Sequence, residues 1–318
     1  MTRRARIAGL GVLAVGLAVA ITAIAQAPDV KQTIQQGDKL FEQKNYKEAA
    51  DQYQKALAAG PAAEQVPGAC EKLIACKLRL QLFDDALKAG ENYVQRTAGT
   101  YHEARAERLT GNLYMLVPHW GTRAGGVFYR AQYKQGIYLQ SVQHDKKLAV
   151  QHLEHARDLY AKYDQAEAGK DPLPADDRKG WHDERIQCIF DLASTVSRFG
   201  IYENNWYYWY AGGERDDERA QTAGEADFDE YQRQWELRRT RPIGLRVGAD
   251  GNPAFPSKPD KYAADIGDDE KILYLLAEVR DLDKSKEGKY VALSYYRQAM
   301  LARARFGMDR ISSWCRFY

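Results

Sequence analysis

Apolar and small residues follow a helical spacing in the first stretch of the chain after its leader. Residues 30–63 read VKQTIQQGDKLFEQKNYKEAADQYQKALAAGPAA and divide near Asn45 into two amphipathic segments. Apolar positions three and four residues apart are typical of helices that bury one face. The positions that define the pattern are Gly37, Leu40, Ala49, Tyr53, Ala56 and Pro61. Small residues let two helices approach closely, Tyr53 fills the space between them, and a proline ends the second helix. The segment therefore predicts a helical hairpin.

The spacing of alanine, then an aromatic residue or leucine four positions on, then alanine recurs later in the chain. It is found at Ala149, Leu153 and Ala156, at Ala292, Tyr296 and Ala299, and in a degraded form at Ala86, Gly90 and Tyr93. Gly111 and Tyr114 have the offset of a first helix, and pairing them with the helix of Ala149 would leave an insertion between the two. A single hairpin cannot bury both of its faces, so we expect its neighbours to pack against it.

Two further segments carry an apolar stripe at helical spacing. Residues 181–199 place Ile186, Ile189, Phe190, Ala193 and Val196 on one stripe. Residues 268–282 do the same with Ile272, Leu275, Leu276 and Val279. We find no sustained alternation of apolar and polar residues, so no β-sheet is expected.

The offsets in residues 30–63 resemble the tetratricopeptide repeat consensus. This resemblance implies antiparallel helix pairs stacked into a right-handed superhelix, with a concave face for peptides or protein segments. The predicted fold class is all-α, a tetratricopeptide-like helical-hairpin solenoid with two long aromatic-rich loop insertions. The expected organisation is a leader at 1–25, the hairpin at 30–63, divergent repeats over 64–200 with an insertion at 117–144, an irregular insertion at 201–265, and a C-terminal helical hairpin at 266–318.

The two insertions break the repeat rhythm and are rich in aromatic residues. The first contains VPHWGTRAGGVFYRAQYKQGIYLQ, in which Gly125 and Gly126 are expected to form a flexible turn. The second begins with a cluster that includes Trp206, Tyr207 and Trp209. Long loops in compact proteins are commonly functional. Such a cluster either lines a groove for carbohydrate or peptide, or folds back and seals the helical stack.

The N-terminus has the features of an export signal. Three arginines precede a 19-residue uncharged run from Ile7 to Ala25, and small residues at its end suit cleavage after Ala25. The run is also long enough to serve as an uncleaved membrane anchor. In both cases we expect the bulk of the chain in the periplasm or at the cell envelope. Removing the three arginines changes the formal net charge from +2 to −1, which argues against a nucleic-acid partner.

Candidate chemistry is sparse. The four cysteines are widely scattered and are expected to be mostly buried free thiols. His152 and His155 lie three residues apart on a predicted helix and could reach one metal ion, but surface histidines are the simpler interpretation. Nucleophile-elbow, zinc-protease and dinucleotide motifs are not found in the sequence. We therefore expect no catalytic residues, no metal and no cofactor.

A second resemblance covers several strings of the chain. LYMLVPHWGTRAGGVFYR, DKKLAVQHLEHARDLY, WYYWYAGGE and GADGNPAFPSKPDKYA are similar to the helical region that precedes large bacterial alpha-2-macroglobulin-like proteins. The resemblance implies an exported N-terminal module. The thioester chemistry of that family needs a Cys-x-Glu-Gln segment, and Cys70 is followed by Glu-Lys-Leu. The reactive residues of the family therefore do not carry over.

The expected function is a non-enzymatic scaffold for protein–protein interaction. From the repeat offsets, Gln35, Lys39 and Glu42 are expected to face the groove and contact a protein or peptide partner. The rival hypothesis is an enzyme or a carbohydrate- or peptide-binding module whose pocket is formed by the two insertions, with Trp206, Tyr207 and Trp209 contributing.

Overall fold

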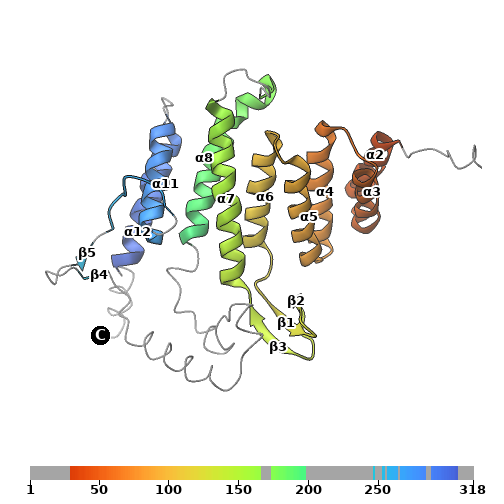
Figure 1. The fold of residues 1–318 in the computed structure, drawn as a ribbon, viewed down its shortest axis with the longest axis horizontal. Helices are drawn as coiled ribbons and strands as arrows, with labels where there is room; N and C mark the ends of the chain where they lie inside the picture. The colour runs from red at the N-terminus through yellow and green to blue at the C-terminus, as the bar shows by residue number, and fades with distance from the viewer. Residues whose placement is uncertain are drawn as a thin grey trace, which may run out of the picture. The chain divides into compact units, whose positions relative to one another are not determined.

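The chain is mostly helical. A computed structural model describes residues 29–165, 173–197, 246–247, 253–254, 256–263, 266–283 and 288–306, and 73% of these residues are helical (Figure 1). The chain divides into two compact units, residues 1–96 and 97–318. Each unit is described by itself below.

The first unit contains four α-helices in its described part. They are α2 (Val30–Glu42), α3 (Tyr46–Ala58), α4 (Val66–Arg79) and α5 (Phe83–Thr97), with a 3-10 turn η1 (Ala63–Gln65) before α4. Asp29 begins α2, because its carboxylate accepts hydrogen bonds from the backbone N–H groups of the first turn. Lys44, with φ of 63°, lies in the short turn that joins α2 to α3. The predicted hairpin at 30–63 is confirmed.

The small and aromatic residues of the hairpin lie where the spacing predicted. Ala49, Tyr53 and Ala56 are fully buried on α3, and Gly37 is buried on α2. The Tyr53 hydroxyl donates a hydrogen bond of 2.7 Å to Asp38. A Cβ atom at position 37 would lie 2.8 Å from Cε1 of Tyr53. Glycine is therefore required at position 37 by the approach of the ring.

Replacing Gly37 with alanine is expected to destabilise the hairpin relative to the same change at Gly68. Position 68 is also helical, but a Cβ there meets nothing within 4 Å. Gly68→Ala should therefore raise the unfolding free energy by up to about 1 kcal/mol through helix propensity. Gly37→Ala gains the same propensity but must displace the buried ring, which costs about 1–3 kcal/mol. Urea unfolding of both variants measures the difference, and equal stabilities would show that Tyr53 can move away freely.

The second unit packs helices from distant parts of the sequence around one core. Its helices are α6 (His102–Leu116), α7 (Val142–Gln165), α8 (Ala175–Ser197), α11 (Asp268–Leu282) and α12 (Lys289–Phe306). Consecutive members of this series pack against each other. Gly111 on α6 lies against α7, since a Cβ there would be 2.8 Å from Cγ of Leu153. The predicted pairing across the first insertion is confirmed.

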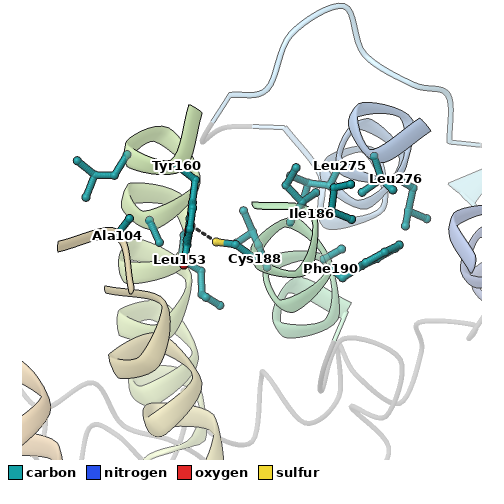
Figure 2. Close-up of a cluster of buried hydrophobic side chains, with 14 of the residues drawn as sticks. Ala104, Leu153, Tyr160, Ile186, Cys188, Phe190, Leu275 and Leu276 are labelled. Carbon is teal, nitrogen blue, oxygen red and sulfur yellow. Dashed lines mark hydrogen bonds between the residues drawn. The ribbon is translucent and has the colours of Figure 1, made fainter. Parts of the chain in front are cut away.

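The core of the second unit is formed by the predicted stripes. Ala149, Leu153 and Ala156 of α7 are fully buried, and every predicted stripe residue of α8 and α11 is buried as well. Figure 2 shows Leu153 and Tyr160 of α7 on one side of Ile186, Cys188 and Phe190 of α8, with Leu275 and Leu276 of α11 on the other. The α7, α8 and α11 helices therefore bury their apolar faces against one another.

The prediction for the last helix was wrong about its buried face. Ala292, Tyr296 and Ala299 lie on the exposed side of α12, with Tyr296 62% exposed. The buried positions are Ser294 and Leu301. Apolar residues occur all around this helix, so their period does not select one face. Only the packing against α11 decides which side is buried.

The expectation of no β-sheet is also wrong for the first insertion. It forms a three-stranded antiparallel sheet of β1 (Trp120–Ala124), β2 (Val127–Arg130) and β3 (Ile137–Gln140), in the order β2-β1-β3. In the second insertion, the two-residue strands β4 (Arg246–Val247) and β5 (Pro253–Ala254) pair with each other antiparallel. Most of the remaining second insertion and the leader at 1–25 lie outside the described residues.

Three of the four cysteines are described, and all three are buried free thiols, as predicted. Burial raises the pKa of Cys70 and that of Cys76 to about 11, and it also raises the pKa of Cys188. These thiols are therefore protonated and unreactive at neutral pH. Within the described ranges, no helix combines the length and apolar character needed to cross a bilayer.

Candidate functional site

The inserted sheet is built from a tight hairpin and one returning strand. The β1–β2 connection is the pair Gly125 and Gly126, with φ of 58° and 80°. Two consecutive residues with positive φ form a hairpin turn whose twist matches that of the strands, and glycine adopts both without strain. The pair predicted as a flexible turn is thus a hairpin turn. A Gly-Gly pair between Arg-Ala and Val-Phe is typical of a two-residue β-hairpin turn, so the hairpin could have been predicted from the sequence.

A buried ion pair joins this sheet to the beginning of α7. Arg130, the last residue of β2, donates from Nη1 and Nη2 to the two oxygens of Asp145 at 2.7 and 3.0 Å. The Asp145 side chain is fully buried and that of Arg130 is 6% exposed. Arg130 also donates to the carbonyl of Pro118, in the α6–β1 connection. The guanidinium group thus links both ends of the insertion to α7.

The environment of Asp145 keeps its carboxylate ionised. Burial by itself would raise its pKa, but hydrogen bonds with His119 and Arg130, together with the charge of Arg130, outweigh burial and hold the pKa below its usual range. The Ser141 hydroxyl donates to the same carboxylate at 2.6 Å. In a Ser–His–Asp triad the serine hydroxyl donates to the imidazole, whereas Ser141 donates to the carboxylate that Arg130 holds, so we interpret this network as an anchor for the sheet.

One side of the anchored sheet carries a group of aromatic residues. Pairing of Thr122 with both Tyr129 and Tyr138 places these tyrosines on the same face as Trp120, because alternate residues of a strand share a face. Tyr133, in the β2–β3 connection, lies with its ring 4.9 Å from that of Trp120 and 6.2 Å from that of Tyr138. We refer to Trp120, Tyr129, Tyr133 and Tyr138 as the aromatic face.

Hydrogen bonds hold the β2–β3 connection against this face. The Thr122 hydroxyl donates to the carbonyl of Gln132 at 2.9 Å and accepts from the backbone N–H of Lys134. The ammonium group of Lys134 lies 3.7 Å from the ring centroid of Tyr129, a cation–π contact. The two bonds of Thr122 hold the backbone on either side of Tyr133, at Gln132 and Lys134, and so position the Tyr133 ring.

Exposed apolar side chains accompany the aromatic face. Tyr133 is 78% exposed, and Val127, which is on the same face because it pairs with Ala124, is 53% exposed. Ile137 is 67% exposed on the opposite face, because it pairs with Arg123. Scattered apolar residues are normal on a protein surface, but a rigid group with partly exposed tryptophan and tyrosine is typical of interaction sites.

The residues that were predicted from the sequence to bind a partner are not part of the aromatic face. Gln35, Lys39 and Glu42 are exposed on α2 in the first unit. Exposure is necessary for contact with a partner, but it does not test whether these three side chains make one. Trp206, Tyr207 and Trp209 lie outside the described residues. The 117–140 segment was singled out for its aromatic residues, but its sheet and its anchor were not predicted.

A second group of polar residues lies between α6 and α7. Glu107 of α6 is 4% exposed. Its two carboxylate oxygens lie 2.5 Å from Nδ1 of His152 and 2.7 Å from Nδ1 of His155, both on α7. The His152 side chain is only 15% exposed and that of His155 is 52% exposed. The interpretation of both as plain surface histidines was wrong for His152, because the approach of α6 and α7 covers it.

Comparison with known proteins does not identify this chain, since no family model matches it and no curated protein has a significantly similar sequence.

Proposed function

We propose that this protein is an exported, non-enzymatic scaffold that binds a protein partner through the aromatic face of its inserted sheet. The observation that carries the proposal is a tryptophan and three tyrosines gathered on one side of a small sheet, with Tyr133 78% exposed. Tyrosine and tryptophan supply large contact areas and are enriched at the centres of protein interfaces.

The anchor of the sheet supports this role. The buried pair of Arg130 and Asp145, and the bonds of Thr122 to the β2–β3 connection, hold the aromatic face in place before any partner binds. A surface that is already ordered loses less conformational entropy on binding, so more of the contact energy contributes to affinity.

The proposed architecture is a set of tetratricopeptide-like hairpins. Close approach at Gly37 in the first unit and at Gly111 in the second supports it, because both glycines meet a large residue of the following helix. We further propose that the chain is related to the N-terminal helical module of alpha-2-macroglobulin-like proteins, which fits an envelope location. The exposed α2 residues Gln35, Lys39 and Glu42 are proposed as a second contact surface for the partner.

Removal of the exposed apolar groups should abolish partner capture. In the double variant Tyr133→Ser with Val127→Ser, both on the aromatic side of the sheet, capture of the partner from the envelope fraction should fall by at least about tenfold. Both side chains are mostly exposed, so the fold should be unaffected. Quantitative mass spectrometry of proteins retained by the immobilised chain measures the change.

The matched control is Tyr295→Ser with Tyr296→Ser on α12, where the side chains are 58% and 62% exposed. A protein captured equally by the wild type and this control, and lost from the sheet variant, supports the proposal. If every protein captured by the wild type is also captured by the sheet variant, the aromatic face is not the binding surface. The triple alanine variant of Gln35, Lys39 and Glu42 tests the second surface in the same way.

Carbohydrate binding is the second candidate function. It is favoured by the nearly parallel rings of Trp120, Tyr133 and Tyr138, whose planes differ by 15° to 32°, because sugar rings stack on aromatic side chains. A glycan array distinguishes the two functions. A saccharide that binds the wild type and not the sheet variant would favour carbohydrate binding over a protein partner.

A further inference from the structure

The carboxylate of Glu107 differs from several other partly or fully buried acids of the second unit. Four of those acids are paired with arginine: Asp145 with Arg130, Asp191 with Arg108, Glu184 with Arg105, and Glu278 with Arg157. Within the described ranges, the ion pairs of Glu107 are with two histidines instead. A buried carboxylate is costly unless a cation or several donors compensate its charge.

Three potential ligands, Glu103, Glu107 and His155, converge at this point, and His152 contacts one of them. Glu103 and Glu107 lie one helical turn apart on α6, and His152 and His155 lie one turn apart on α7, so each helix presents two side chains on one face. Ligand atoms of Glu103, Glu107 and His155 all lie within 4.8 Å of one another. Nδ1 of His152 is 2.5 Å from the second oxygen of Glu107.

The close contact of α6 and α7 positions these groups. A Cβ at Gly111 would lie 3.0 Å from the carbonyl oxygen of Ala149, so only glycine permits this separation of the helices. The ring of Tyr114 stacks on that of His152, with centroids 5.7 Å apart, and restricts its rotation. The backbone N–H of Gly99 donates to Glu103 at 2.7 Å. Such supporting contacts orient ligands in known metal sites.

From this geometry we propose that Glu103, Glu107 and His155 bind a divalent transition metal, with Zn²⁺ preferred, and that His152 orients Glu107 through its hydrogen bond. One imidazole nitrogen and two carboxylates, with a water in the fourth position, are a donor set that zinc accepts, whereas calcium and magnesium prefer oxygen ligands alone. Two carboxylates also balance the charge of a divalent ion. The metal would join α6 to α7 and place a cation beside the buried carboxylate of Glu107.

The ligand atoms already lie near the separation that the ion requires. Ligand atoms about 2.0–2.1 Å from zinc in a tetrahedron are about 3.4 Å apart. Those of Glu103, Glu107 and His155 are within 4.8 Å of one another, and Nδ1 of His155 must move away from its 2.7 Å contact with Glu107 by less than 1 Å. His155 is 52% exposed and Glu103 partly exposed, so both can turn, and the ion can enter from solvent on that side.

Zinc titration of the purified, chelator-treated full chain tests the site. Calorimetry should show saturable binding of one zinc ion per chain, and zinc should raise the melting temperature. His155→Gln and Glu103→Gln each remove a partly exposed ligand without disturbing the core, and each should weaken zinc binding by at least about tenfold. The matched controls are His144→Gln on α7 and His182→Gln on α8, which lie outside the cluster and should bind zinc as the wild type does.

Cobalt substitution checks the donor atoms. A site of nitrogen and oxygen ligands should show the visible bands of tetrahedral cobalt without a sulfur-to-cobalt charge-transfer band. Wild-type binding that both ligand variants lose and both controls keep confirms the site. No zinc binding by the wild type, unchanged affinity in the double variant His155→Gln with Glu103→Gln, or a sulfur charge-transfer band would each overturn the proposal. None of these results depends on whether the aromatic face binds a partner.

Discussion

Replacement of Trp181 by alanine is expected to lower the free energy of unfolding of the second unit by about 3–5 kcal/mol. Trp181 is 1% exposed, on α8, and its ring contacts those of Tyr101, Tyr160 and Tyr163. Its Nε1 also donates to the carbonyl of Tyr160 at 3.1 Å, and the guanidinium of Arg105 lies 5.6 Å from its ring. Truncation would leave a large cavity among rigid aromatic side chains, which cannot collapse to fill it.

Urea unfolding followed by far-ultraviolet circular dichroism measures this effect. The control is Tyr133→Ala, which removes an aromatic ring that is 78% exposed and should change stability by less than about 0.5 kcal/mol. Trp181→Phe keeps most of the packing but loses the hydrogen bond to Tyr160, so its stability should fall between those of the other two. A Trp181→Ala variant as stable as the control would show that this cluster does not hold the unit together.

Replacement of Asp145 by alanine is expected to cost a similar amount, about 3–5 kcal/mol. The change leaves the guanidinium of Arg130 buried without its carboxylate, and it removes the acceptor of Ser141 and the partner of His119. The double variant Arg130→Met with Asp145→Leu removes both charges together. It should recover most of the loss, because a buried ion pair is often no more stable than well-packed apolar groups.

The matched control is Asp158→Ala on the same helix, where the side chain is 75% exposed and the expected change is below about 0.5 kcal/mol. The pKa of Asp145 is lower in the folded chain than its unfolded value of about 3.9. The contribution of the Asp145 carboxylate to the free energy of unfolding is therefore complete at neutral pH. It is lost as the pH falls from the unfolded pKa of this group through its folded pKa. Asp145→Ala should be less sensitive to acid over that range. An acid sensitivity equal to that of the wild type would contradict the assigned ion pair.

Local pattern was sufficient for the helical hairpin and for most of the core. Contact between Gly37 and Tyr53 could be predicted, because the glycine lets the two helices approach closely and the tyrosine at this offset fills the space beside it. The stripes of α7, α8 and α11 could be predicted because each of these helices has one apolar face. In such segments, burial follows from hydrophobicity and period alone.

The candidate sites depend on pairs that no local pattern relates. Glu107 lies 45 and 48 residues from its histidines in sequence, and Arg130 lies 15 residues from Asp145. Each pair forms only because two elements pack in a particular register. The sheet itself was within reach of prediction, since Gly125 and Gly126 form a hairpin signal, but its strands are too short to alternate clearly.

By itself, the sequence of this protein determined that most of its described helices form and which faces of most of them are buried, because those properties depend on spacing along one segment. The tertiary structure alone decided that Arg130 and Asp145 join the 117–140 sheet to α7, that α12 turns Tyr296 outward, and that Glu107 lies between two histidines. These properties depend on the distance between segments, which is determined by packing and not by the order of residues within any one of them.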